Sequence, residues 1–424
     1  MKHSTEKYFD QTVDTLQKLL RIDTVKSAAE ANAPFGRGNA ECLRLALDMA
    51  KDLGFETVNC DNYAGHADFG DGEETVGVLG HLDVVPAEGE WTSPPFGGQI
   101  IDGFLYGRGT LDDKGPMVAC LYAMKALKDE GFVPKKKIRW ILGSDEESGW
   151  ACMDYYAKKF AMPQTGFSPD GNFPLINREK GLYHFNLNLG KVNENIVCFE
   201  SGLRLNVVPD TARAEVKIDG APVTLSAEGV SCHGSMPQNG DNAAWKLFKA
   251  LHAIFPDDRA VAFAAEKLCA DFNGHAWGLP FEDGPSGKIT HNIGKVRLEN
   301  GELCLGIDIR YPVTFTEAQI VDAIKANSPG AVTKLHAHAP LYVEESSELV
   351  QKLLKAYADT TGQEAYTIAV GGATYARSLP QGVAFGPAFP GEEKNIHCID
   401  EKVSLEGLKQ MLKIYYEAIK ALGS

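Results

Sequence analysis

Short apolar strands that end in acidic residues or histidine restrict the fold of this chain more than any other feature. Ile138–Gly143 is such a strand, and the acidic run Asp145–Glu147 follows it almost directly. Thr75–Gly80 is another, and it ends at His81. Adjacent carboxylates at the edge of an apolar core repel one another unless cations neutralise them. The pattern favours an open α/β sheet, because such sheets place their ligands beyond the carboxyl ends of their strands.

A helix is expected between these two strands. It starts at Pro116, since proline is tolerated in the first helical turn, where its missing N–H would have no partner. Its apolar residues follow the spacing of one helix face: Met117, Cys120, Leu121, Met124 and Leu127. A second helix, with apolar residues at the same spacing, is expected over Leu349–Tyr357. Strands that alternate with such helices predict an α/β domain.

The middle of the chain has a different periodicity. Apolar and polar residues alternate over Ala212–Ile218 and over Leu303–Ile309, and a helix with one apolar face begins near Asp241. A period of two is typical of antiparallel strands with one covered face. The sequence therefore predicts an open α/β domain formed by residues 1–186 and 341–424. A smaller α+β domain, residues 187–340, is inserted into it.

Composition limits the classes of partner. A chain of 424 residues is long enough for two domains. The net charge of -15 argues against nucleic acid and anionic membrane, since both require a basic face. Nine cysteines without a C-x-x-C pair favour reduced thiols. With no export signal and no apolar run of the roughly 20 residues that a membrane helix needs, a cytoplasmic protein is expected.

Four segments at strand ends carry acids, the first together with a histidine: Gly80–Asp83, Gly107–Pro116, Asp145–Gly149 and Ser168–Asp170. Each segment alone also fits a polar loop, and the second fits a turn that caps a helix. All four together favour a metal site. Carboxylates and imidazoles without thiolates suit Zn²⁺, Mn²⁺ or Co²⁺.

These motifs resemble the acetylornithine deacetylase, aminoacylase and carboxypeptidase G superfamily of co-catalytic metallopeptidases. The resemblance lies in Gly80–Pro86, Tyr106–Gly115 and the Glu146–Glu147 pair, and it covers nearly the whole chain. Within the superfamily, Trp91–Pro95, Glu146–Trp150 and Gly166–Asp170 resemble the peptidase V dipeptidases. The resemblance implies a catalytic domain of zinc-exopeptidase type, with an open mixed sheet, and an inserted α+β lid domain.

The resemblance also implies a set of metal ligands for two divalent ions, zinc first and manganese or cobalt as alternatives. Asp112 would bridge both metals. His81 and Asp170 would complete the protein ligands of one metal, and Glu147 and His397 those of the other.

Two further acids near these ligands receive separate interpretations. Glu146 would act as general base on the metal-bridging water and pass the proton to the leaving amine. Asp83 would orient the ring of His81 without binding a metal itself. The sequence assigns no chemistry to Asp113.

The inserted domain is expected to supply substrate contacts. By resemblance, His233 would stabilise the oxyanion of the transition state, and Asn206 would assist it. Arg310 lies on the polar face of its strand, where a guanidinium fork suits a substrate carboxylate. The alternatives are a turn histidine for His233 and a surface arginine for Arg310. The glycine-rich loop with Gly371, Gly372 and Thr374 resembles the family loop that lines the substrate pocket.

The resulting hypothesis is hydrolysis of dipeptides that carry a free N-terminus and a C-terminal carboxylate. An N-acyl amino acid deacylase or a carboxypeptidase with the same metals is the nearest alternative. A non-catalytic peptide-binding protein is another, although Glu146 argues against it, because a binding protein needs no general base. A serine hydrolase is disfavoured, since no G-x-S-x-G elbow occurs. A monomer is favoured, with a small-molecule substrate as the partner.

Overall fold

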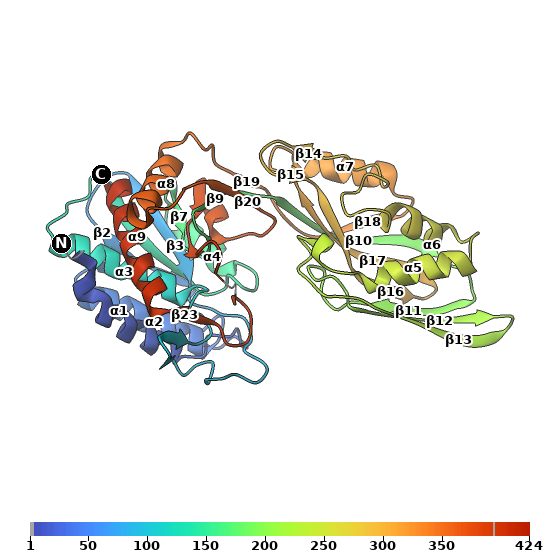
Figure 1. Ribbon diagram of the computed structural model, residues 1–424, viewed down its shortest axis with the longest axis horizontal. Helices are drawn as coiled ribbons and strands as arrows, with labels where there is room; N and C mark the ends of the chain where they lie inside the picture. The colour runs from blue at the N-terminus through green and yellow to red at the C-terminus, as the bar shows by residue number, and fades with distance from the viewer. Residues whose placement is uncertain (1–3, 393–394) are drawn as a thin grey trace. The chain divides into compact units, whose positions relative to one another are not determined.

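A computed structural model describes residues 4–392 and 395–424 of the chain. The chain divides into two compact units, which are described separately (Figure 1). The first unit contains Met1–Asn177, Val343–Ile368 and Ala373–Ser424, and the second contains Arg178–Tyr342 and Ala369–Gly372. Residue 187, the expected start of the inserted domain, lies inside a strand of the second unit. The loop glycines Gly371 and Gly372 also belong to the second unit.

The first unit is built from strands and helices in alternation. Its helices are α1 (Phe9–Leu20), α2 (Arg37–Asp52), α3 (Lys114–Asp129), α4 (Ala151–Lys159), α8 (Glu348–Thr361) and α9 (Leu405–Gly423). Its main strands are β1 (Glu56–Cys60), β2 (Ala64–Phe69), β3 (Thr75–His81), β6 (Lys137–Gly143), β7 (Thr165–Ser168), β9 (Leu175–Glu179) and β21 (Gln381–Ala384). Shorter strands are β4 (Gln99–Ile101), β5 (Phe104–Tyr106), β8 (Gly171–Asn172), β20 (Thr367–Val370), β22 (Pro387–Ala388) and β23 (Lys402–Ser404).

The main sheet of the first unit is mixed. Its strand order is β1-β2-β6-β3-β7-β21-β9. The central neighbours β6, β3, β7 and β21 run parallel, whereas β1, β2 and β9 pair antiparallel. Both strands predicted at Thr75–Gly80 and Ile138–Gly143 are present in the parallel centre. The predicted open mixed sheet is thus confirmed.

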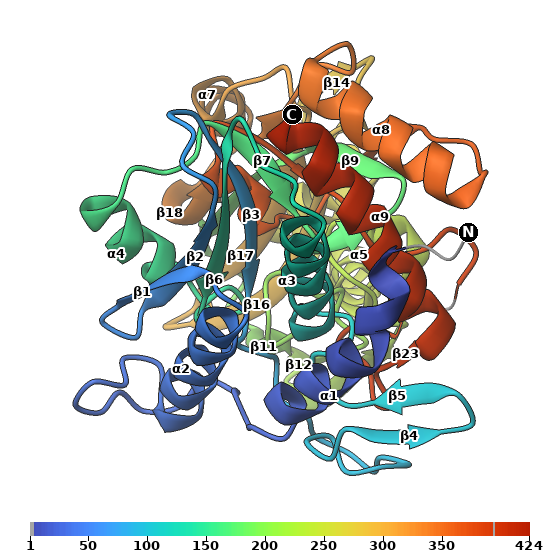
Figure 2. The same cartoon turned by 90° about the vertical axis from the view of Figure 1, so that its left-hand side faces the viewer.

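Helices bury both faces of this sheet, as parallel strands require. One face packs against α1, α2, α3, α8 and α9 through residues such as Val78 and Trp140. Helices α3 and α9 lie side by side on it (Figure 2). The other face packs against α4 through Leu79 and Ile141. The helix predicted around Pro116 is α3, although it begins two residues earlier, at Lys114.

The second unit is an antiparallel sheet with helices on one face. Its sheet order is β13-β12-β11-β16-β17-β10-β18. The strands are β10 (Gly181–Lys191), β11 (Ile196–Ser201), β12 (Thr211–Ile218), β13 (Ala221–Glu228), β16 (Thr290–Glu299), β17 (Glu302–Tyr311) and β18 (Ala331–His338). Its helices are α5 (Ala243–Ile254), α6 (Arg259–Phe263) and α7 (Glu317–Asn327), and the short strands are β14 (Glu282–Asp283), β15 (Gly287–Lys288) and β19 (Leu341–Tyr342).

The period of two read from the sequence matches the burial of β12, whereas in β17 both faces are buried from Leu305 to Tyr311. Leu303, Leu305, Ile307 and Ile309 of β17 are all buried in one core with the apolar face of α5. Helix α5 begins after Asn242, whose side chain accepts hydrogen bonds from the amides of Ala244 and Trp245. The opposite face of the sheet is therefore left for polar side chains. Among the described residues, none of the helices is both long and apolar enough to cross a membrane.

Candidate metal and catalytic site

The parallel strands of the first unit bring three of the five predicted ligands, His81, Glu147 and Asp170, to one edge of the sheet. His81 closes β3 and pairs in register with Gly143 at the end of β6, from which the chain enters the run Asp145–Glu147. The amide of Leu82 donates to the carbonyl of Gly143, 3.0 Å away, which ties the two strand ends together. Asp170 follows β7, the other parallel neighbour of β3.

Asp112 lies between two histidines that are far apart in the sequence. Its Oδ1 atom is 2.9 Å from Nε2 of His81, and its Oδ2 atom is 2.7 Å from Nε2 of His397. Glu147 Oε1 is 2.9 Å from the same His397 nitrogen. Asp170 Oδ2 is 3.8 Å from His81 Nε2. The two carboxylate oxygens thus face two separate groups of potential ligands.

The donor atoms fit divalent metal ions. Ligand atoms of His81, Asp112 and Glu147 lie within 4.8 Å of one another, as do those of His81, Glu146 and Asp170. His81 Nε2 and Asp112 Oδ1 are buried, and neither has a hydrogen-bond partner of suitable geometry among the described residues. Buried polar atoms without partners are costly, so both atoms suit a shared cation.

Asp83 organises this cluster in a way that differs from the prediction. Its main-chain carbonyl, 2.9 Å from His81 Nδ1, is the atom that contacts the ring, whereas its carboxylate is 3.6 Å away. A proton on Nδ1 would leave Nε2 as the metal-facing lone pair. The Asp83 carboxylate instead accepts hydrogen bonds from the amides of Glu146 and Glu147, each at 3.0 Å. It therefore fixes the backbone that carries both glutamates.

The electrostatics of the cluster also point to cations. Burial raises the pKa of Glu146 well above its usual value, and burial together with nearby Asp112 raises the pKa of Asp170 to about 8. Burial lowers the pKa of His397, but its contacts with Asp112 and Glu147 outweigh this effect and raise it to about 11. Acids that resist ionisation beside histidines that hold their protons indicate an excess of negative charge, which bound metals would offset.

His397 has an unusual backbone conformation. Its φ angle is 62°, in the left-handed region that residues other than glycine seldom adopt. Such conformations persist where surrounding contacts impose them, and they concentrate at functional sites.

Glu401 and Arg108 form a buried support that the sequence analysis did not identify. Glu401 Oε1 accepts from the amides of Gly109, Leu111 and Asp112 at 3.0, 3.0 and 3.3 Å. Its Oε2 accepts from Arg108 Nη1 at 2.8 Å, and the same nitrogen donates to the carbonyl of Cys398 at 3.0 Å. The pair thus connects the loop of Asp112 with the segment of His397. Arg108 lies in the segment Gly107–Pro116 and Glu401 follows His397 by four positions, but their pairing spans 293 positions.

Replacing Glu401 with glutamine is expected to weaken metal binding by about 10–100-fold, because partners that orient metal ligands typically contribute this much. Glutamine keeps the shape of the side chain but loses the charge that Arg108 and three amides require. Competition with a coloured chelator would measure the metal affinity. Glu406→Gln, an exposed position at the start of α9, is the matched control. Unchanged affinity in a folded Glu401→Gln protein would contradict the supporting role.

In the second unit, the structure brings His233 and Asn206 together. The amide of Gly234 donates to the carbonyl of Asn206 at 2.8 Å, and His233 Nδ1 is 2.7 Å from Ser235 Oγ. Asn292 Nδ2 donates to the carbonyls on both sides of Asn206, those of Leu205 and Val207. The loop that carries Asn206 is therefore held in a defined conformation.

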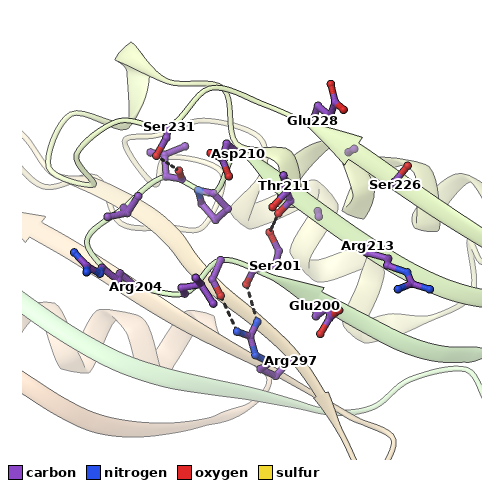
Figure 3. Close-up of a pocket in the computed structure, with 17 residues that line it drawn as sticks. Glu200, Ser201, Arg204, Asp210, Thr211, Arg213, Ser226, Glu228, Ser231 and Arg297 are labelled. Carbon is purple, nitrogen blue, oxygen red and sulfur yellow. Dashed lines mark hydrogen bonds between the residues drawn. The ribbon is translucent and has the colours of Figure 1, made fainter. Parts of the chain in front are cut away.

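A cavity of about 790 Å³ borders this loop (Figure 3). Arg204 and Val207, on either side of Asn206, contribute to its wall. Arg297 anchors the beginning of the loop, because its Nη1 and Nη2 atoms donate to the carbonyls of Ser201 and Gly202 at 2.9 and 2.7 Å.

Arg310 contacts the glycine-rich loop, as its Nη1 donates to the carbonyl of Gly371 at 2.6 Å. Its Nε and Nη2 atoms are engaged by Asp308 at 2.8 and 3.1 Å, which was not anticipated. Gly372 lies next in this loop. Thr374 belongs to the first unit, where its hydroxyl accepts from the amide of Ala376 and caps a short 3₁₀ helix, Tyr375–Ser378.

Comparisons with known proteins identify the family of the chain. The profile of "Peptidase family M20/M25/M40" matches residues 77–421. A protein of Bacillus subtilis (strain 168) described as "Putative dipeptidase YtjP" is 38% identical over 443 residues, covering 96% of this chain and 96% of that protein.

Two solved structures have a similar fold. Human carnosine dipeptidase 1 has a TM-score of 0.64 at 15% identity and covers 99% of this chain and 97% of its own. The M20 family metallo-carboxypeptidase Sso-CP2 of Sulfolobus solfataricus has a TM-score of 0.63 at 16% identity, covering 98% of this chain and 99% of its own. The family profile, the curated relative and the cluster of metal-binding side chains lead to one conclusion: the chain belongs to peptidase family M20/M25/M40 and is a metallopeptidase.

Proposed function

We propose that this enzyme hydrolyses dipeptides that carry a free N-terminus and a C-terminal carboxylate, with two divalent metal ions at the site. One observation carries the proposal: the two oxygens of Asp112 lie 2.9 and 2.7 Å from two different histidines. A carboxylate in this position suits a bridging ligand. His81 and Asp170 would complete one metal site, and Glu147 and His397 would complete the other. Zinc is the expected metal, with manganese or cobalt as alternatives.

The chemistry divides between the metals and the protein. When bound, a pair of divalent ions lowers the pKa of a water molecule, polarises the scissile carbonyl and stabilises developing negative charge. Glu146 removes a proton from the attacking water and delivers it to the leaving amine. Asp83 keeps Glu146 in place through the hydrogen bond to its amide.

The second unit acts as a lid that binds substrate in this proposal. His233 donates a hydrogen bond to the oxyanion, and Asn206 assists it. Arg310 binds the substrate carboxylate, with Gly371, Gly372 and Thr374 lining the pocket. The description of the Bacillus relative as a dipeptidase supports dipeptides as the substrate class. We further propose that the enzyme works in the cytoplasm as a monomer.

A small panel of substrates tests this function. We expect the metal-supplemented enzyme to cleave a free dipeptide much faster than the matching tripeptide, the dipeptide C-terminal amide or an N-acetyl amino acid. The dipeptide places its carboxylate at a fixed distance from the scissile bond, and a longer peptide overshoots Arg310. Preferential cleavage of the N-acetyl amino acid would instead make the enzyme a deacylase. Equal cleavage of the dipeptide, its amide and the tripeptide would favour a broader aminopeptidase.

Arg310→Ala is expected to lower kcat/KM for a dipeptide, since a charge-assisted contact to the substrate is lost. The decrease should correspond to a loss of about 2–4 kcal/mol of transition-state stabilisation. KM should rise and kcat should fall, because binding energy at the carboxylate helps to align the carbonyl. Steady-state kinetics would measure both constants. Arg213→Ala, which removes an exposed arginine paired with Glu215 in the same unit, is the control. An Arg310→Ala enzyme with wild-type kinetics would exclude the carboxylate contact.

His233→Ala is expected to depress mainly kcat, by roughly a hundredfold or more, as loss of an oxyanion donor does. The KM for the dipeptide should change little, because the donor acts on charge that develops in the transition state. His275→Ala, at an exposed histidine of the same unit, is the control. A variant that changes KM alone would reassign His233 to substrate binding.

A further inference from the structure

Arg310 is buried with most of its hydrogen-bonding capacity already used. The residue is 3% exposed, and Asp308, two positions earlier on β17, is fully buried. Asp308 Oδ1 accepts from Arg310 Nε at 2.8 Å, and Asp308 Oδ2 accepts from Nη2 at 3.1 Å. The carbonyl of Gly371 accepts from Nη1 at 2.6 Å. Asp308 thus occupies the side-on fork of the guanidinium.

A count of donors limits what Arg310 can offer to a substrate. A guanidinium carries five N–H donors in a rigid plane. Asp308 and Gly371 take three of them, which leaves one N–H on Nη1 and one on Nη2. A carboxylate can therefore be held only at the Nη end of the group. Because the remaining contacts fix the plane and the rotamer, binding there requires little further ordering of the side chain.

Asp308 is in turn fixed by its neighbours across the sheet. It lies opposite His184 of β10 and Asn292 of β16 in the strand register. His184 Nε2 is 3.1 Å from Asp308 Oδ1. Burial raises the pKa of Asp308, but Arg310 and His184 outweigh this effect and hold it at about 2. The residue is therefore an anion near neutral pH, and it offsets the charge of Arg310.

We propose that Asp308 is a positioning residue for Arg310: it aims the Nη end of the guanidinium at the substrate carboxylate and makes recognition depend on geometry rather than on an unpaired positive charge. The inference rests on the proposed role of Arg310 in dipeptide binding. Asp308 itself does not touch the substrate. Its effect should therefore appear in the choice between a free carboxylate and its amide, and should vanish when Arg310 is absent.

The test is a double-mutant cycle with Asp308→Asn, Arg310→Ala and the double variant. The readout is kcat/KM for a dipeptide divided by kcat/KM for its C-terminal amide. Asp308→Asn should lower this ratio by roughly tenfold or more, because a small misplacement of a binding group has effects of this size. In the Arg310→Ala background, Asp308→Asn should leave the ratio unchanged. A merely structural role would lower activity on both substrates alike and keep the ratio, which would overturn the proposal.

A second measurement separates this proposal from the proposed function. Phenylglyoxal reacts with accessible guanidinium groups, and mass spectrometry of peptides locates the modified arginine. Arg310 should react faster in Asp308→Asn than in the wild type, whereas Asp322→Asn, on the exposed face of α7, should not alter the rate. Equal rates in all three proteins would overturn the positioning role, whatever the substrate. If the wild type fails to distinguish dipeptide from amide, the carboxylate-binding role of Arg310 is overturned, and the labelling alone decides whether Asp308 orients Arg310.

Discussion

Glu146→Gln is expected to lower kcat by about 10²–10⁴-fold while two metals remain bound, because general base and proton donor disappear together. Glutamine preserves the shape of the side chain and the amide hydrogen bond to Asp83, so the backbone of the site should remain in place. The KM for a dipeptide should change little. Steady-state kinetics and elemental analysis on the same sample would measure both effects.

Glu147→Gln is the matched variant, because Glu147 is the adjacent residue and its backbone is held by the same Asp83 carboxylate. Its Oε1 atom is 2.9 Å from His397 Nε2, so its loss should weaken or empty one metal site. The ligand atoms of Glu146 also lie within 4.8 Å of those of His81 and Asp170, so the reverse assignment has a geometric basis. Metal loss in Glu146→Gln with full occupancy in Glu147→Gln would exchange the two roles.

Removal of the metals by a chelator is expected to abolish hydrolysis, and Zn²⁺, Mn²⁺ or Co²⁺ should restore it. The metal-free enzyme should also unfold at a lower temperature than the metal-bound enzyme, because a ligand that binds only the folded state stabilises that state. Without metals, Asp112, Glu146, Glu147 and Asp170 crowd one site, and burial raises the pKa of three of them above its usual value. Activity assays and thermal unfolding of the same preparations would follow both effects. Full activity in a sample verified as metal-free would reject the site.

Much of the fold and of the cluster was accessible from local sequence. Strands β3 and β6 are short apolar runs whose ends are marked by His81 and by the acids after Gly143, and parallel pairing brings these ends to one edge. The alternation in β17 predicted which side chains join the apolar core and placed Arg310 on the opposite face, although that face is also buried at Asp308 and Arg310. These features depend on periodicity and on chain direction, which the sequence displays directly.

Other features depend on contacts between distant segments, and periodicity carries no information about them. No pattern in the sequence distinguishes Glu401 from other charged residues. Its role follows only from its hydrogen bonds to the amides of Gly109, Leu111 and Asp112. Alternation placed Asp308 on the same face as Arg310, but it could not reveal that Asp308 occupies the guanidinium fork. Asp83 was expected beside His81, yet its carboxylate turned to the amides of Glu146 and Glu147, because those donors need acceptors at the strand end.

The contact between Asp112 and His397 has a consequence for the biosynthesis of the enzyme. A chain is synthesised from its N-terminus, and its domains generally fold as units. His81, Asp112 and Glu147 are thus synthesised long before His397 and Glu401, but the unit that holds them also contains Val343–Ile368 and Ala373–Ser424. The cluster of acids and histidines should therefore form only after these later segments have been made. Chains truncated before His397 should accordingly bind metal weakly and remain inactive.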